Sequence, residues 1–411
     1  MSSLRKKIFA TAGYTTVFMG AGRKEFNPQQ PMRQFEDYIT ETAQGTCAQI
    51  PLPTFDEGII GSFMAARFIQ QGNLPGFLPF MLPALTDKPC TAVEGACGTG
   101  GRAIAMGIRS ILSELSQSTF VAGFEIQNTV KSVYGADILA GAAYYNGERK
   151  NGHAHFFPGI FSDRAGRYYE KYGYALTREA MATWYKNAIE NARKNPKAQE
   201  YQNTNPSLFE TGMLPPDPKK FVPHLNHTDC SKISDGAASL LITSEEGLQR
   251  SGIPLSQAIE IIGIGEAVAD ITKKPIDPTF LSTTSAAVKK ALAMAKISLN
   301  DIAILEIHDC FTITALLALE AIGLAPTGQA PAFILEGNTH LKGKLPTNLS
   351  GGLGGFGHPT GATGVRQLVD LHQQLTGTAP NQAKLHSPYG MMISMGGNDR
   401  TVTCLIVKKG S

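Results

Sequence analysis

Hydrophobic residues follow two spacings along this chain, and the spacings predict alternating strands and helices. Short apolar runs, partly β-branched and bounded by Gly or polar residues, predict buried strands. These runs lie at 118–124, 235–244, 258–265 and 302–307, and a further strand is expected within the first twenty residues. Strands of this kind, separated by helices, are typical of an α/β protein with a mostly parallel sheet.

Apolar residues spaced three to four positions apart predict the helices that cover this sheet. They lie at 99–115, 177–193, 284–297, 312–324 and 363–375. The first of them carries Ile104, Ile108, Ile111 and Leu115 on its apolar face.

The middle of the chain has a different character. Residues 127–228 are richer in Asn, Tyr, Lys, Pro and Gly and predict an inserted, loop-rich domain. The segments before and after it, 1–126 and 229–269, would then form one half of the protein, and 270–411 the other. Each half has a strand, a Cys at the following turn and an apolar-faced helix, which indicates an approximate internal duplication.

Composition and charge narrow the class of protein. With 411 residues, 42% hydrophobic and 17% charged, the chain is expected to fold into a soluble globular protein. The net charge of +3 has no long basic runs behind it, so nucleic acid is not an expected partner. No apolar stretch reaches 18 residues, so no membrane span is expected. Six Cys without zinc spacing indicate reduced thiols in a cytoplasmic compartment.

Cys97 is the first candidate for chemistry. It lies in GACGTGG, between a short strand and the helix at 99–115. Glycines leave room for a substrate, and the positive end of a helix dipole favours the reactive thiolate. A nucleophile for acyl transfer is therefore one interpretation. A small, inert Cys buried at a crowded turn is the other.

Two histidines are further candidates. His308 begins the tetrapeptide His308-Asp309-Cys310-Phe311 at the end of a predicted strand, where α/β sheets place their ligand sites. His358 lies in GGLGGFGHPTGATG, whose GxGxxG match follows no strand and so does not predict a dinucleotide site. Both histidines could be general bases, and both could equally be structural.

Other polar clusters favour simpler interpretations. Gly396 to Asp399 separates two β-favouring runs and predicts a hairpin turn with exposed N–H groups, which could stabilise an oxyanion. His153 and His155 have no further metal ligands nearby in the sequence, so no metal site is expected. Asp163 and Arg164 are expected on a solvated face.

Taken in order, VEGACGTGG, HDCF and GGLGGFGHPTGATG resemble the motifs of the thiolase family, and the HDCF variant is most similar to the sterol carrier protein type. The resemblance implies two duplicated βαβαβαββ halves in a five-layered αβαβα core with an inserted loop domain. It also implies a homodimer or homotetramer that uses coenzyme A thioesters as substrates and holds no tightly bound cofactor.

The resemblance also assigns roles to residues. Cys97 would be acylated on its sulfur, His358 would take the thiol proton, and His308 would help to form an oxyanion hole. The family's second Cys is replaced by Ser394 in SMGGND, a poor substitute because a hydroxyl is far less acidic than a thiol. Cys310 of HDCF is expected to act as acid and base instead.

Backbone groups and the cofactor portion of the substrate complete the expected site. The N–H groups of Cys97 and Gly396 would form an oxyanion hole around the acyl group, and Ser231 would contact coenzyme A. The resulting expectation is an acyl-CoA C-acyltransferase of fatty acid or other lipid metabolism. A thioesterase or specialised C-acyltransferase, and a non-catalytic acyl-CoA binding protein, are the alternatives.

Overall fold

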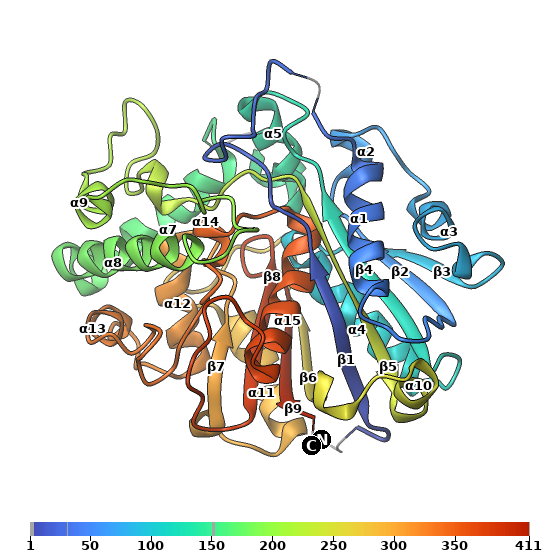
Figure 1. The fold of residues 1–411 in the computed structure, drawn as a ribbon. Coiled ribbons are helices and arrows are strands. Elements are labelled where there is room, and N and C mark those ends of the chain that lie inside the picture. Colours follow the sequence, from blue (N-terminus) through green and yellow to red (C-terminus); the bar gives the residue numbers. More distant parts are fainter. Residues whose placement is uncertain (1–3, 31, 150–152, 411) are drawn as a thin grey trace.

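The computed structural model describes residues 4–30, 32–149 and 153–410. One nine-stranded sheet has the order β3-β2-β4-β5-β1-β6-β9-β8-β7. The strands are β1 (Ile8–Thr15), β2 (Glu57–Gly61), β3 (Cys90–Val93), β4 (Ser118–Glu125), β5 (Gly236–Ser244), β6 (Ala258–Val268), β7 (Ile302–Glu306), β8 (Tyr389–Gly396) and β9 (Thr401–Lys409). Figure 1 shows the sheet running across the molecule, with helices on both sides.

Helices fill most of the intervening sequence. They are α1 (Phe35–Cys47), α2 (Ala65–Phe68), α3 (Phe77–Met81), α4 (Thr99–Leu112), α5 (Ser132–Leu139), α6 (Tyr145–Glu148), α7 (Phe156–Tyr172), α8 (Tyr174–Ala192), α9 (Leu208–Met213), α10 (Glu245–Ser251), α11 (Ser282–Ala295), α12 (Thr312–Ile322), α13 (Ala330–Leu335), α14 (Gly352–Gly355) and α15 (Thr360–Thr376). A single 3₁₀ turn, η3 (Ala96–Gly98), comes directly before α4.

The sheet is built from the same arrangement used twice. In the first half, β2 runs parallel to β3 and β4, while β4–β5 and β5–β1 are antiparallel. In the second half, β7 runs parallel to β8, while β8–β9 and β9–β6 are antiparallel. A parallel bridge between Leu305 and Thr347 occupies the place of β3. The duplication inferred from the sequence is therefore present in the strand order, and β1 and β6 join the two halves.

Two helices lie between the halves. Helices α4 and α15 pack on each other and contact strands of both halves, and α15 is buried on nearly all sides. Helix α1 contacts β1, β4 and β5, and α11 contacts β6 and β9. The two halves of the continuous sheet thus lie on either side of α4 and α15, with α1 outside the first half and α11 outside the second. This order of helix, sheet, helix, sheet and helix agrees with the five-layered core expected from the resemblance.

The predicted strands and helices are confirmed, with small differences at their ends, but the expectation of a mostly parallel sheet is wrong. The pairs β2–β3, β2–β4 and β7–β8 are parallel, whereas β1–β5, β1–β6, β4–β5, β6–β9 and β8–β9 are antiparallel. Apolar runs indicate that a strand is buried and do not record the direction of its neighbour. Helix 99–115 ends at Leu112, and Leu115, expected on its apolar face, is 87% exposed. The turn between β8 and β9 comprises residues 397–400, one residue later than predicted. Such end positions depend on local capping contacts that hydrophobic spacing does not register.

The middle of the chain, 127–228, contains helices α5 to α9 in the described residues. Figure 1 shows α7, α8 and α9 beside α12 and α13, away from α1 to α3. The exact domain boundaries stay a prediction. One expectation here is wrong: Arg164 is buried, not solvated, because its guanidinium donates to Asn398 Oδ1 and to the carbonyl of Pro278, both at 2.6 Å.

Candidate active site

Cys97 and His358 are brought together where α4 and α15 cross. Cys97 lies in η3, immediately before α4, and His358 lies just before α15. The crossing is made by glycines: a Cβ on Gly364 would lie 2.4 Å from the backbone nitrogen of Gly101, and one on Gly100 would lie 2.6 Å from that of Val365. Because side chains at these positions would clash, the glycines allow the two N-terminal turns to approach closely.

His308 completes a compact group with these two residues. It follows β7, and its imidazole lies edge-on to that of His358, with ring centroids 5.1 Å apart. One ligand-type atom from each of Cys97, His308 and His358 lies within 4.8 Å of the others. Three residues far apart in the sequence therefore share one small volume, as the sequence analysis expected.

The orientation and tautomer of His358 follow from its hydrogen bonds. The hydroxyl of Thr363 donates to the carbonyl of Pro359 at 3.0 Å, so the Oγ1 of Thr363 accepts from Nδ1 of His358 at 2.7 Å. The proton of the neutral ring is then on Nδ1, and Nε2 carries a free lone pair. Nε2 is buried without a hydrogen-bond partner among the described residues. It is therefore available to accept a proton.

Both imidazoles are neutral in the resting protein. Burial lowers the pKa of His308 to about 3 and that of His358 well below its usual value, and the charge of Arg366 acts in the same direction. A neutral imidazole can act as a base at any pH above its pKa.

The expectation of a Cys97 thiolate is wrong for the resting protein. The side chain is only partly accessible, and the loss of solvation raises the pKa of its thiol to about 12. Backbone N–H groups of Gly397 and of Cys97 itself favour the thiolate, but burial outweighs them. A thiol in this environment needs a base to ionise it, and Nε2 of His358 is an unpartnered acceptor on a residue of the same cluster.

Cys310 is buried beside this group. Its sulfur lies 3.7 Å from Oγ1 of Thr314, and it is 7% exposed. Burial raises the pKa of the Cys310 thiol well above its usual value, and the nearby Cys97 raises it further. Cys310 thus holds its proton at rest. The structure places the HDCF cysteine with the other candidates.

The β8–β9 hairpin closes the site from another direction. Gly396 lies against η3: a Cβ on Gly98 would be 2.9 Å from the nitrogen of Gly396. The next residue, Gly397, has a positive φ of 65° and directs its N–H toward the Cys97 sulfur. The sequence analysis identified Gly396 but missed Gly397, although the Gly-Gly pair in a predicted turn was visible.

Ser394, which replaces the expected second Cys, has a fully buried hydroxyl with no hydrogen-bond partner among the described residues. A Cβ on Gly101 would come within 3.0 Å of that hydroxyl, and one on Gly364 within 2.8 Å. The side chain therefore fills the space at the helix crossing.

A buried charged group underlies the imidazoles, and the sequence analysis missed it. Arg366 of α15 donates to Ser350 Oγ at 2.6 Å and to the carboxylate of Asp370, and it lies 3.6 Å from a Glu306 oxygen. Glu306 is the last residue of β7, two positions before His308. These contacts tie the end of β7 to α15 and so hold His308 against His358. Helical spacing between residues 366 and 370 was the available clue.

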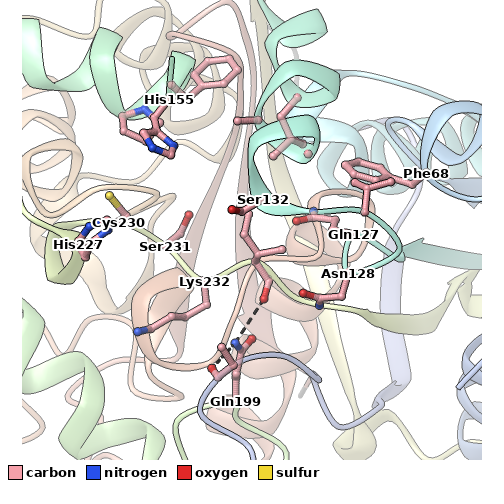
Figure 2. Close-up of a pocket in the computed structure, with 18 of the residues that line it drawn as sticks. Phe68, Gln127, Asn128, Ser132, His155, Gln199, His227, Cys230, Ser231 and Lys232 are labelled. Carbon is pink, nitrogen blue, oxygen red and sulfur yellow. Dashed lines mark hydrogen bonds between the residues drawn. The ribbon is translucent and has the colours of Figure 1, made fainter. Parts of the chain in front are cut away.

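A cavity of about 410 Å³ lies between residues 127–139 and 155–158 on one side and the 227–233 loop on the other. Figure 2 shows His227, Cys230 and Ser231 on one wall and Phe68 and Gln127 on the other. Ser231 therefore lies in a cavity, as its expected substrate contact requires. His155, for which the sequence predicted no role as a metal ligand, also lines it.

Residues in the cavity walls form hydrogen bonds with the loops that carry Cys310 and His358. The N–H of Ser231 donates to the carbonyl of Cys310 at 2.8 Å, and the amide of Gln127 donates to the carbonyl of His358 at 3.1 Å. Leu139, another wall residue, packs in a cluster with Ala96, the neighbour of Cys97. The cavity walls are therefore linked through these contacts to the segments that carry Cys97, Cys310 and His358, none of which lines the cavity itself. Most of the residues that line the cavity come from the middle segment, 127–228, for which the sequence predicted the fewest elements.

Comparisons with known proteins agree with this geometry. Residues 265–409 match the family model described as thiolase C-terminal domain-like. The acetyl-CoA acetyltransferase of Methanothermobacter thermautotrophicus is 30% identical over 383 residues, covering 91% of this chain and 94% of the relative. This chain belongs to the thiolase family. Rat sterol carrier protein 2 is another thiolase-like relative, 28% identical over 91% of this chain and 66% of its own length.

Solved structures show that the chain has the thiolase fold. The Ltp2–ChsH2(DUF35) aldolase superposes with a TM-score of 0.79, at 18% identity over 99% of both chains. Human mitochondrial 3-ketoacyl-CoA thiolase, solved in complex with CoA, superposes with a TM-score of 0.68, also at 18% identity over 99% of both chains. Within the described residues of this thiolase-family chain, no helix has the length and apolar character needed to span a membrane.

Proposed function

We propose that this chain is an acyl-CoA C-acyltransferase that cleaves 3-oxoacyl-CoA with CoA, or runs the reverse condensation. The observation that supports the proposal most directly is the position of Cys97 beside His358, whose Nε2 is free and whose Nδ1 is fixed by Thr363. A thiol with a raised pKa needs such a base. Membership of the thiolase family supports the same chemistry.

In the cleavage direction, Nε2 of His358 takes the proton of Cys97 as the sulfur attacks the 3-oxo carbon. A new carbon–sulfur bond forms, and the bond between C2 and C3 of the substrate breaks. The departing acetyl-CoA carbanion takes the proton of Cys310. The high pKa of the Cys310 thiol suits this step, because a fully protonated thiol is needed as the acid.

Coenzyme A then releases the acyl group. Its thiol gives a proton to the Cys310 thiolate and its sulfur attacks the acyl carbon, while the Cys97 sulfur leaves and takes the proton back from His358. Acyl-CoA is formed, and Cys97, His358 and Cys310 regain their initial protonation. Backbone N–H groups of Cys97 and Gly396 are proposed to stabilise the oxyanion on the acyl group, and His308 the oxygen of the acetyl-CoA enolate.

The cavity is the proposed entry for the CoA thioester. Its lining is mostly apolar, with Ser231, Gln127 and Lys232 among the polar residues, which suits a pantetheine arm with few hydrogen-bonding groups. Assembly as a homodimer or homotetramer and a role in lipid metabolism belong to the same proposal.

The decisive experiment supplies acetoacetyl-CoA and free CoA to the purified chain and measures acetyl-CoA. We expect CoA-dependent production of acetyl-CoA, loss of activity by at least 10³-fold in Cys97→Ala, and an acetyl group on Cys97 in a mass spectrum of the quenched enzyme. Cys47→Ala serves as the matched control, since Cys47 ends α1 and packs in a different hydrophobic cluster. Unchanged turnover in Cys97→Ala would exclude the proposed nucleophile.

The alternatives give different results in the same assay. A thioesterase would release the acid and CoA without consuming free CoA, and a non-catalytic binder would give neither product. For the acid–base role of Cys310, we expect Cys310→Ala to lose carbon–carbon cleavage, while acylation of Cys97 by acetyl-CoA becomes slower but stays measurable, because a CoA thiolate leaves far more easily than a carbanion. Full cleavage activity in that variant would exclude the role.

A further inference from the structure

The cluster of Cys97, His308 and His358 has the composition and spacing of a site for a thiophilic metal ion. One donor atom from each residue lies within 4.8 Å of the others. Zinc binds Cys sulfur at about 2.3 Å and His nitrogen at about 2.0–2.1 Å, so an ion at the centre would draw the three donors inward by about an ångström. Three protein donors with a fourth position open to solvent or ligand is a common zinc arrangement.

A second observation also points to a bound ion. Nδ1 of His308 and Nε2 of His358 are both buried without hydrogen-bond partners among the described residues, and His308 is 2% and His358 6% exposed. A buried ring nitrogen without a partner is costly, and an ion coordinated by Nε2 of His358 would supply that partner.

Surrounding contacts resemble those that support metal-binding histidines. Such a histidine usually donates its second ring N–H to an oxygen, which fixes the tautomer and directs the lone pair at the ion. Thr363 provides this oxygen for Nδ1 of His358.

We propose that this cluster binds Zn²⁺ or a similar thiophilic divalent cation, and that the bound ion reversibly blocks acylation of Cys97. Binding replaces the thiol proton, which passes to solvent, by a metal–sulfur bond. The ion and an acyl group compete for the same sulfur, so an acylated enzyme cannot hold the ion in this way. The inhibitory part rests on the proposed function; metal binding itself does not.

Cobalt provides a readout that does not depend on catalysis. Titration of the purified chain with Co²⁺ should give a thiolate-to-cobalt charge-transfer absorption that saturates at one ion per chain, and Zn²⁺ should abolish it by displacement. Cys97→Ala should lose the band, and His358→Asn should bind at least tenfold more weakly. Thr363→Val should weaken binding by about 10–100-fold. Cys47→Ala should bind like the unmodified protein.

Absence of the band at millimolar Co²⁺, or an equal band in Cys97→Ala with unchanged circular dichroism, would overturn the proposal. Zn²⁺ should also inhibit acetyl-CoA formation in proportion to occupancy, and prior acetylation should protect the enzyme. A chain that binds cobalt at Cys97 but does not cleave acetoacetyl-CoA would refute the proposed function and leave the metal site in place. A chain that cleaves acetoacetyl-CoA but gives no cobalt band would refute the metal site and leave the proposed function in place.

Discussion

For single residues, the surroundings of Cys97 decide whether its thiol is protonated. The thiol lies at a helix start, where the dipole favours an anion, yet burial keeps it protonated and raises its pKa to about 12. In the proposed mechanism its reactivity depends on His358, whose Nε2 is free because the hydrogen bond to Thr363 keeps the ring proton on Nδ1. Two predictions follow from this pair.

Alkylation of Cys97 by iodoacetamide should increase about tenfold per pH unit from pH 7 to pH 9, because only the thiolate reacts and the raised pKa keeps it scarce throughout this range. Mass spectrometry of the Cys97 peptide measures the rate without interference from the other cysteines. A rate that levels off below pH 8 would contradict the raised pKa and would indicate a preformed thiolate–imidazolium pair.

Thr363→Val should lower kcat/KM for thiolysis by about 10–100-fold, since the Nδ1 proton loses its acceptor and the ring can adopt the tautomer that blocks Nε2. The KM for CoA should stay within twofold, because Thr363 does not line the cavity. Thr363→Ser, which restores the hydroxyl, should recover most of the activity. Equal rates for the Val and Ser variants would refute the assignment of the tautomer.

Among the elements, helix starts and turns position the site. The carboxylate of Asp399, in the β8–β9 turn, accepts hydrogen bonds from the backbone N–H groups of Thr283 and Thr284 in the first turn of α11, both at 2.9 Å. The hairpin that carries Gly396 and Gly397 is thereby attached to a helix on the outer side of the sheet. The contacts of Asp399 therefore do two things: they cap the start of α11, and they hold the turn that carries the N–H groups of Gly396 and Gly397.

Asp399→Ala should lower the free energy of unfolding by about 1–2 kcal/mol, as removal of a helix cap does, and should also reduce thiolysis because the turn is released. Ser244→Ala is the matched control. Ser244 accepts from the N–H of Gly247 and caps α10. It should cost a similar stability in urea unfolding with activity unchanged. Equal activity losses in both variants would show that stability alone is responsible.

For the whole molecule, a buried ion pair and one further hydrogen bond connect the middle segment to helix α12 of the second half. Arg178 of α8 makes two hydrogen bonds to Asp229, at 2.7 and 2.8 Å, and both side chains are at most 1% exposed. Asp229 also accepts from the hydroxyl of Thr312 at the start of α12. The helix that follows the HDCF motif is thus held to the segment that forms the cavity.

Arg178→Met should lower the free energy of unfolding by about 3–5 kcal/mol, because it leaves the Asp229 charge buried without its partner. Lys186→Met tests the same helix at an exposed pair with Glu190, 3.0 Å apart, and should cost less than about 1 kcal/mol. Urea unfolding monitored by circular dichroism compares the two. Similar losses in both variants would contradict the distinction between buried and exposed pairs.

The sequence by itself determined the types of the elements and the candidates for chemistry. Hydrophobic spacing predicted β4 to β7 and helices α4, α8, α11, α12 and α15 because burial of one face produces a local, repeating pattern. Three ordered motifs identified Cys97, His308, Cys310 and His358, and the repeated strand–Cys–helix pattern indicated the duplication. These properties can be read from neighbouring residues.

Only the tertiary structure decided how these groups act. Contacts between distant segments set the protonation of Cys97, the pairing of Gly397 with its sulfur, the burial of Arg164 and the shape of the cavity. Each of these depends on solvent exclusion by residues far apart in the chain, and no local spacing records that exclusion. The arrangement of the site therefore depends on the close crossing of α4 and α15. The sequence of either helix alone does not specify that crossing.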